Sequence, residues 1–132
     1  HPLALLRPRL ARLRLPSARE LEAVPHGRTV RACGIVTVRQ RPGTAKGTIF
    51  VTLEDETGPV NVIVWPAVVE AWRAPLLQSQ LLAVQGEWQC GQGDAKEEPG
   101  VTPVRHLIAA RFKDLTPWLG QLAQRQRSRD FH

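Results

Sequence analysis

The sequence predicts a mainly β fold, a small barrel of five strands, on the basis of three observations. Apolar and polar residues alternate with a period of two from Thr29 onward, as they do in strands that are buried on one face. Glycines and prolines divide this alternation into short, closely spaced segments. A single stretch with helical periodicity lies between the third and the fourth segment. The length of 132 residues accommodates one such domain with terminal segments left over.

Residues 1–28 are predicted to form a helical segment that leads into the barrel from a preceding region. Pro8 lies inside the first helical pattern and is expected to kink or divide it. A second helix, ending at about Val24, is expected after a capping box, in which two side chains satisfy free backbone donors. The capping box is Ser17-Ala18-Arg19-Glu20, and the leucines of the first helix recur three and four residues apart at Leu3, Leu6, Leu10 and Leu13.

Residues 29–112 are predicted to form the barrel. The first strand is expected from Val30 to Arg39, and Gly34 in its middle suggests a bulge or the sharp bend that small barrels need. Its inward residues are predicted to be Val30, Ala32, Val36 and Val38. The second and third strands are expected to turn Ile49, Val51, Leu53, Val60, Val62 and Val64 inward.

The order of the remaining elements specifies the type of barrel. Pro66 suits the first turn of a helix, and Pro75 is expected to end that helix. A fourth strand is expected around Leu82 to Trp88, and a fifth from about Val104 to Arg111. Three strands, a helix and two further strands are the order of the OB fold, a five-stranded barrel that binds oligonucleotides or oligosaccharides.

Residues 113–132 are predicted to be a C-terminal helix followed by a polar tail. Thr116 and Pro117 suit the N-cap and the first helical position. The two cysteines, Cys33 and Cys90, lie in predicted strands and are interpreted as free thiols of a reducing compartment. A disulfide between adjacent strands is the alternative.

The net charge of +6 is concentrated outside the predicted barrel. Residues 1–28 carry six basic and two acidic groups, and residues 111–132 carry five basic and two acidic groups. Residues 29–110 carry seven basic and eight acidic groups, a net charge of −1. A nucleic-acid-binding face on the barrel must therefore be a local patch.

The sequence predicts neither a catalytic site nor a metal site. The histidines are scattered singly, at His1, His26, His106 and His132, and no two have the spacing of zinc ligands. Glu54-Asp55-Glu56 resembles a magnesium site but is interpreted as a solvated turn. No run approaches the roughly 18 apolar residues of a membrane-spanning helix. We therefore expect no cofactor in this segment and no membrane association.

One face of the predicted barrel has the residues that single-stranded nucleic acids require. Arg39, Arg41 and Lys46 cluster around the first hairpin loop, which OB domains use to bind oligonucleotides. Phe50 is predicted to point outward, where a base can stack on it, and Asn61 to point outward on the next strand, where it can bind a base edge. The alternative is that a terminal helix covers Phe50 and that the arginines are merely solvated.

The four tryptophans are interpreted as packing residues. Trp72 and Trp118 lie on predicted helices, and Trp65 and Trp88 are expected to pack at the edges of the barrel rather than to stack on bases.

Three segments carry a resemblance to a known family. They are residues 34–47 (GIVTVRQRPGTAKG), residues 49–58 (IFVTLEDETG) and residues 61–65 (NVIVW). They resemble the OB domain of C-family bacterial DNA polymerases, and more closely that of the error-prone branch. The first eight residues (HPLALLRP) and the last five (SRDFH) resemble that branch too, so the likeness covers essentially the whole chain.

The resemblance implies a parent polymerase that extends primers across damaged templates in the bacterial cytoplasm, alongside accessory mutagenesis proteins. Its catalytic carboxylates and their Mg²⁺ belong to a palm domain outside this segment. The OB domain of that family is thought to contact single-stranded template DNA, and Arg105 is a further candidate contact. The same barrel resembles the anticodon-binding domain of class II tRNA synthetases, in which an aromatic residue of the second strand and nearby polar groups receive bases. The resemblance places Phe50 and Asn61 at the corresponding strand positions, with Arg39 and Arg41 nearby.

The expected loop at residues 91–100 departs from that pattern because it is acidic and should repel phosphate. This charge favours a second hypothesis, in which the isolated, monomeric module is a docking platform for an accessory protein through its terminal helices or its acidic loop. A tRNA-binding module is the third hypothesis.

Overall fold

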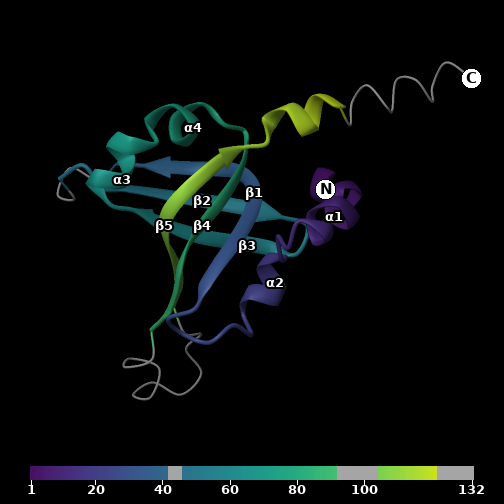
Figure 1. Cartoon of the computed structure of the whole chain (residues 1–132), viewed down its shortest axis with the longest axis horizontal. Helices are drawn as coiled ribbons and strands as arrows, with labels where there is room; N and C mark the ends of the chain where they lie inside the picture. Colours follow the sequence, from purple (N-terminus) through teal and green to yellow (C-terminus); the bar gives the residue numbers. More distant parts are fainter. Residues whose placement is uncertain (42–45, 92–103, 122–132) are drawn as a thin grey trace, which may run out of the picture.

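The structure, a computed structural model, describes residues 1–41, 46–91 and 104–121, and its centre is a closed β-barrel (Figure 1). The strands are β1 (Thr29–Gln40), β2 (Ile49–Asp55), β3 (Gly58–Val64), β4 (Leu81–Cys90) and β5 (Arg105–Asp114). They close in the order β1-β2-β3-β5-β4, with β3 and β5 parallel and all other neighbours antiparallel. The predicted OB arrangement is confirmed, and β5 continues past the expected boundary at residue 112.

Strand β1 closes the barrel because its two halves pair with different strands. Its first half, as far as Ile35, pairs with β4, and its second half, from Ile35, pairs with β2. Gly34 lies at the crossing point, where a Cβ would come within 2.8 Å of the Glu54 backbone nitrogen. Glycine is therefore required here for the close approach of two backbones.

The β-bulge of β1 lies beyond Gly34, between Val36 and Val38. An extra residue in one strand reverses the side-chain alternation that follows. Val38 consequently points outward and is 40% exposed, so the prediction that it points inward was wrong.

The interior of the barrel is filled by aliphatic side chains from every strand. The predicted inward residues of β2 and β3 are all buried, which confirms the period-two reading of both strands. The core also contains Leu82, Val84, Trp88, Leu107, Ala109 and Phe112.

The link between β3 and β4 consists of two short helices, α3 (Pro66–Ala71) and α4 (Arg73–Gln78). Pro75 was expected to end a single helix, but it lies in the first turn of α4, where its missing N–H has no intrahelical acceptor to lose. Val69 and Leu76 are buried, so these helices close one end of the barrel.

The N-terminal segment has its own apolar cluster at the other end. Helix α1 (Pro2–Arg12) continues through Pro8, so the helix is not divided there. Helix α2 (Ala18–Leu21) begins with the predicted capping box and ends before Val24. The cluster combines Leu3, Leu6, Leu10, Leu15, Cys33, Leu81 and Leu115. Leu13 was expected in the buried stripe but is 46% exposed.

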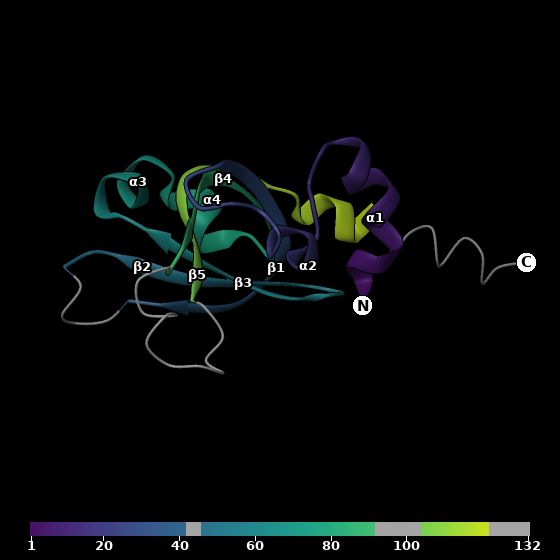
Figure 2. The same cartoon turned by 90° about the horizontal axis from the view of Figure 1, so that it is seen from below.

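Helix α1 and the chain segment after β5 lie side by side next to this cluster (Figure 2). The guanidinium of Arg9 lies 3.8 Å from the ring centre of Trp118, and Arg9 Nη1 donates to Gln121 Oε1 at 3.1 Å. A helix spans residues 116–121. Thr116 was expected to cap it, but its hydroxyl accepts from the backbone N–H groups of Gln80 and Leu81.

Both cysteines are free, as predicted. Cys33 is buried in β1, and desolvation raises the pKa of its thiol to about 12. No helix in the described part of the chain is long and apolar enough to cross a membrane.

The turn between β2 and β3 holds the N-terminal segment on the barrel, which the sequence did not predict. The Asp55 carboxylate is 4% exposed and accepts from the Ala18 backbone N–H at 2.7 Å. It also accepts from the N–H and the hydroxyl of Thr57, both at 2.7 Å, and from the N–H of Gly58 at 3.1 Å. The interpretation of this acidic run as a solvated turn was therefore wrong at Asp55.

Arg7 completes this attachment. Its Nη2 lies 3.3 Å from Asp55 Oδ2, its Nε lies 3.1 Å from Glu56 Oε2, and Nη2 also pairs with Glu56 Oε1. Its Nη1 donates to the Leu15 carbonyl at 3.1 Å. The hydrogen bond to Glu56 raises the pKa of Arg7.

Replacement of Asp55 tests the attachment. Asp55→Ala leaves buried backbone donors without acceptors, so we expect the free energy of unfolding to fall by about 3 kcal/mol in urea denaturation. Glu54→Ala is the matched control, because Glu54 is exposed and its removal should change stability by at most about 0.5 kcal/mol. Equal effects of the two substitutions would contradict the assigned role of Asp55.

Replacement of Gly86 tests the close packing of β4 on β5. A Cβ on Gly86 would lie 1.9 Å from the Ile108 carbonyl oxygen, a backbone atom that cannot rotate away. We expect Gly86→Ala to lower the free energy of unfolding by about 2–3 kcal/mol, measured by thermal or urea unfolding. Gly120→Ala serves as the control, because nothing lies within 4 Å of its added Cβ. A neutral Gly86→Ala would show that the two strands separate easily.

Candidate nucleic-acid interface

The outer faces of β2 and β3 present a row of paired side chains. Phe50 pairs with Ile63, and Thr52 pairs with Asn61, while the alternate residues of both strands are buried in the barrel. Directly opposed residues lie about 5 Å apart between Cβ atoms. Phe50 is 36% exposed, which confirms that it points outward. Its accessible ring can therefore serve as a stacking surface.

Asn61 lies on the same face with a free donor. The Thr52 hydroxyl lies 3.5 Å from Asn61 Oδ1, where it can donate to the amide oxygen. The Asn61 NH₂ group makes no hydrogen bond to the described residues and can donate to another acceptor, such as a base edge. Both side chains are accessible to solvent at this position.

Arg41 and Lys46 lie at one end of this row. Arg41 follows Gln40, which pairs with Phe50, and both Arg41 and Lys46 are exposed. Lys46 adopts a positive φ of 48° and is followed by Gly47 with a φ of 95°, so the chain turns sharply into β2. These two exposed cations therefore lie at the Phe50 end of the row.

Arg39 has a different environment from its neighbour Arg41. It pairs with Val51, an inward residue, because the bulge of β1 has reversed the alternation. Its Nε donates to the Leu76 carbonyl at 2.9 Å, and its Nη2 donates to the Ser79 carbonyl. These are carbonyls at the C-terminal end of α4, which a cation stabilises. Arg39 thus joins α4 to the barrel, a structural role that the sequence did not predict.

Arg105 is not brought into the Phe50–Asn61 row. It begins β5, is half-buried, and pairs with Cys90 of β4. The acidic loop expected at residues 91–100 lies outside the described residues, apart from Gly91.

Two apolar residues on this face were missed from the sequence. Trp65, interpreted as edge packing, is 48% exposed and follows the end of β3, two residues after Ile63. Val38 pairs with Thr52 and is also exposed. The period of two could have revealed Trp65, whereas Val38 depends on the position of the bulge.

The histidines that make hydrogen bonds have structural partners. His1 Nδ1 accepts from the Leu3 N–H at 3.2 Å and caps α1, and His26 Nδ1 accepts from the Cys90 N–H at 3.0 Å. Across the described ranges, no three His, Cys, Asp or Glu side chains are grouped in a way that could hold a metal ion.

Residues 30–102 match a family model described as the OB-fold nucleic acid binding domain, and the chain belongs to this family. The chain is also 54% identical over 132 residues to an error-prone DNA polymerase of Ralstonia nicotianae, and 53% identical over 135 residues to one of Bordetella parapertussis. All of the chain is aligned, but it spans only 11% and 12% of these relatives. It therefore corresponds to a segment of such a protein.

A solved structure confirms the fold. An asparaginyl-tRNA synthetase from Pyrococcus horikoshii superimposes with a TM-score of 0.58 at 21% sequence identity. The superposition covers 77% of this chain and 22% of the synthetase.

The contrast between Arg39 and Arg41 gives a testable prediction. Arg39→Ala removes donors from two carbonyls at the end of α4, so we expect the free energy of unfolding to fall by about 1–2 kcal/mol. Arg41→Ala removes an exposed side chain of the same kind and should change it by at most about 0.5 kcal/mol. Urea denaturation of the two variants measures the difference, and equal stabilities would refute the structural role of Arg39.

Proposed function

We propose that the chain is a non-catalytic OB module of an error-prone DNA polymerase and that it binds single-stranded template DNA on the outer faces of β2 and β3. The observation that carries the proposal is the row of outward side chains on β2 and β3. Phe50 lies opposite Ile63, and Asn61 and exposed Trp65 lie two residues before and after Ile63. Arg41 and Lys46 are exposed at the Phe50 end of this row. The names of the aligned polymerases supply the biological setting.

The chemistry of the row suits a single strand better than a duplex. Exposed rings accept unstacked bases, which a duplex does not offer, and each stacked base contributes about 1–3 kcal/mol. Asn61 adds a donor for a base edge, and Arg41 and Lys46 supply phosphate contacts. The rings of Phe50 and Trp65 with two cations give weak binding, which allows the module to release and rebind a template that moves during synthesis.

The parent polymerase supplies the rest of the reaction in this proposal. The nucleotidyl transfer and its Mg²⁺ belong to residues outside this segment, in a protein that works in the bacterial cytoplasm during synthesis across damaged DNA. This module contributes template binding. Arg105 and the remaining donors of Arg39 are secondary candidates for phosphate contact, because one is half-buried and the other is engaged with carbonyls.

Fluorescence anisotropy of labelled oligo-dT at low salt tests the binding. We expect saturable binding, and we expect Phe50→Ala with Trp65→Ala to weaken it about tenfold or more, since about 1.4 kcal/mol corresponds to a factor of ten. With two phosphate contacts, from Arg41 and Lys46, the logarithm of affinity should fall with the logarithm of salt concentration with a slope of roughly −1.4.

The matched control removes two exposed leucines elsewhere. Leu5→Ala with Leu77→Ala takes away apolar surface that is 60% and 40% exposed, on α1 and α4, and should leave binding unchanged. Absence of binding by the folded chain would contradict the proposal and favour partner docking. Preference for folded tRNA over oligo-dT would instead indicate an RNA-binding module.

A further inference from the structure

We propose that a second surface, on the outer side of β1, β4 and β5, binds an acidic segment of a partner protein that also carries leucine-like side chains. We call this surface the basic groove. Two adjoining open cavities form it, of about 240 Å³ and about 440 Å³, and both are lined by Arg31 and Gln85. Its other cationic residues are Arg14, Arg111 and Lys113.

The strand register places these cations in rows. Arg31 pairs with Gln85, and Gln85 pairs with Arg111, so two guanidinium groups flank one amide across three strands. Ala83 pairs with Lys113 in the next row. Arg31, Arg111 and Lys113 are all exposed, and none of the described residues that line the two cavities is an Asp or a Glu. The groove is therefore complementary to carboxylates.

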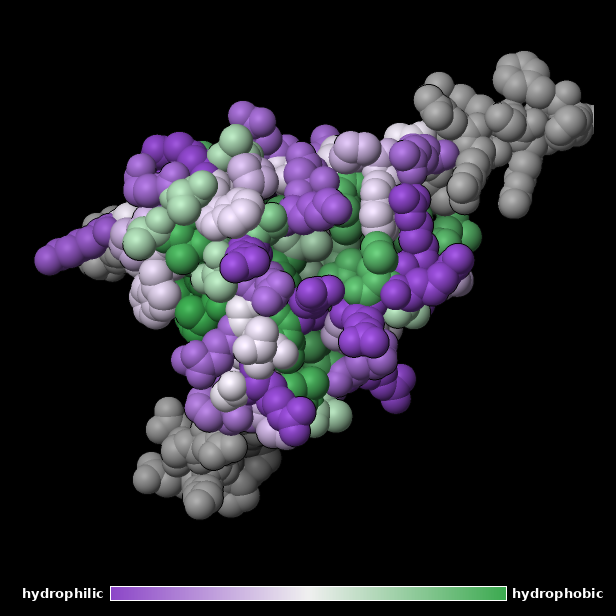
Figure 3. Space-filling view, in the orientation of Figure 1, coloured by the Kyte–Doolittle hydropathy of each residue, from purple (hydrophilic) through white to green (hydrophobic). Residues whose placement is uncertain are grey.

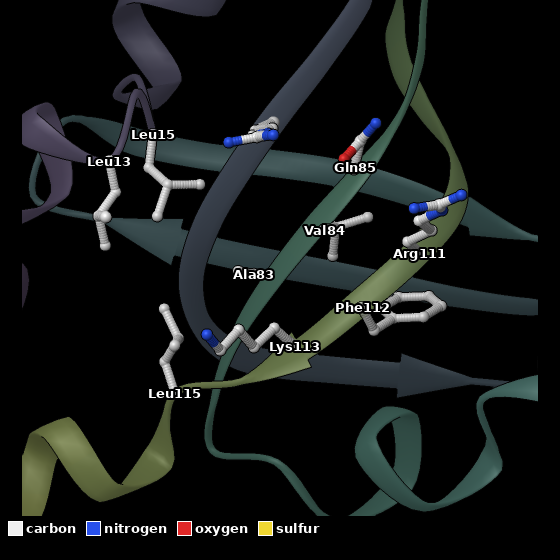
Figure 4. A pocket seen from close by; sticks show the side chains of 10 residues that line it. Leu13, Leu15, Ala83, Val84, Gln85, Arg111, Phe112, Lys113 and Leu115 are labelled. Carbon is white, nitrogen blue, oxygen red and sulfur yellow. The ribbon is translucent and has the colours of Figure 1, made fainter.

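The basic groove also has an apolar border. Leu13 and Leu15, from the link between α1 and α2, and Leu115, beyond β5, form one side of the groove (Figure 4). Leu13 is 46% exposed, although it belongs to a segment whose other helical leucines are mostly buried. The space-filling view shows hydrophobic surface between hydrophilic side chains on the face where β4 and β5 lie in front (Figure 3). The exposed side chain of Leu13 beside arginines suits an amphipathic peptide.

A protein segment fits this groove better than nucleic acid does. The aromatic residue that lines it, Phe112, is 6% exposed and packs edge-on against Trp72, with ring centres 6.3 Å apart. It therefore offers no face on which a base could stack. An aliphatic side chain can instead pack against exposed Leu13, while neighbouring carboxylates pair with the arginines.

The basic groove is separate from the Phe50 face. Strands β4 and β5 cross in front of β2 and β3, so the outer faces of the two pairs point to opposite sides of the barrel (Figure 1). The module can accordingly hold a single strand on one side and a protein on the other, and each site can be tested without the other.

The test uses a fluorescein-labelled twelve-residue peptide rich in Asp and Glu with two leucines four positions apart, titrated with the full chain. A second peptide replaces both leucines by serine. We expect the leucine peptide to bind at low salt at least fivefold more tightly than the serine peptide. Arg111→Ala with Lys113→Ala should weaken its binding about tenfold, whereas Phe50→Ala with Trp65→Ala should leave it unchanged.

A second double variant with the same net charge tests whether a loss of binding comes from the groove residues or from the lower overall charge. Arg12→Ala with Arg73→Ala removes two exposed cations outside the groove and should retain peptide binding. Circular dichroism confirms that each variant is folded. Equal losses in both double variants, equal binding of the two peptides, or no peptide binding at about 1 mM of the chain would overturn the proposal. Displacement of the peptide by oligo-dT that persists in the Phe50→Ala, Trp65→Ala variant would assign the groove to nucleic acid instead.

Discussion

Closure of the barrel by a single long strand is the constraint on which the other features depend. Because β1 must pair with β4 along its first half and with β2 along its second, it has to bend sharply where it passes from one to the other. Gly34 permits the close approach to the Glu54 backbone at the crossing, and the bulge just beyond it absorbs one residue. This extra residue decides which side chains of the second half face solvent and which face the barrel.

The bulge thereby links the closure of the barrel to the composition of the candidate binding face. It turns Val38 outward beside Thr52, and it turns Arg39 toward the end of α4, where two carbonyls accept its N–H groups. Two basic residues that are close in sequence consequently have different roles. Arg41 is exposed beside the Phe50 row, and Arg39 connects a helix to the barrel.

A second long-range interaction keeps the terminal helices away from this row. Asp55 accepts from Ala18 and Thr57, and with Glu56 it pairs with Arg7, so the N-terminal segment is fixed to the β2–β3 turn. Arg9 and Trp118 hold the C-terminal helix against α1 at the same end. The exposed rings near the first hairpin loop therefore remain accessible. The same arrangement places Leu13 and Leu15 against the outer side of β4 and β5, where they contribute to the basic groove.

The sequence by itself determined the elements whose signals are local. The sequence pattern predicted all five strands, the period of two predicted the outward position of Phe50, and the S-x-x-E pattern predicted the start of α2. The same period of two also predicts an outward position for Trp65, but this residue was interpreted as packing at the barrel edge. These features depend on residues a few positions apart, so pattern is sufficient to predict them.

Only the tertiary structure decided the roles of Asp55, Arg39 and Leu13. In the sequence, Asp55 is only an acidic residue in a turn. In the structure its carboxylate is buried and accepts a hydrogen bond from the Ala18 N–H, 37 positions away. The partners of Arg39 lie 37 and 40 positions along the chain. A charged side chain is stable in either water or a hydrogen-bonded site, and sequence pattern does not distinguish these environments. The distinction comes from closure of the barrel, which brings distant donors and acceptors together.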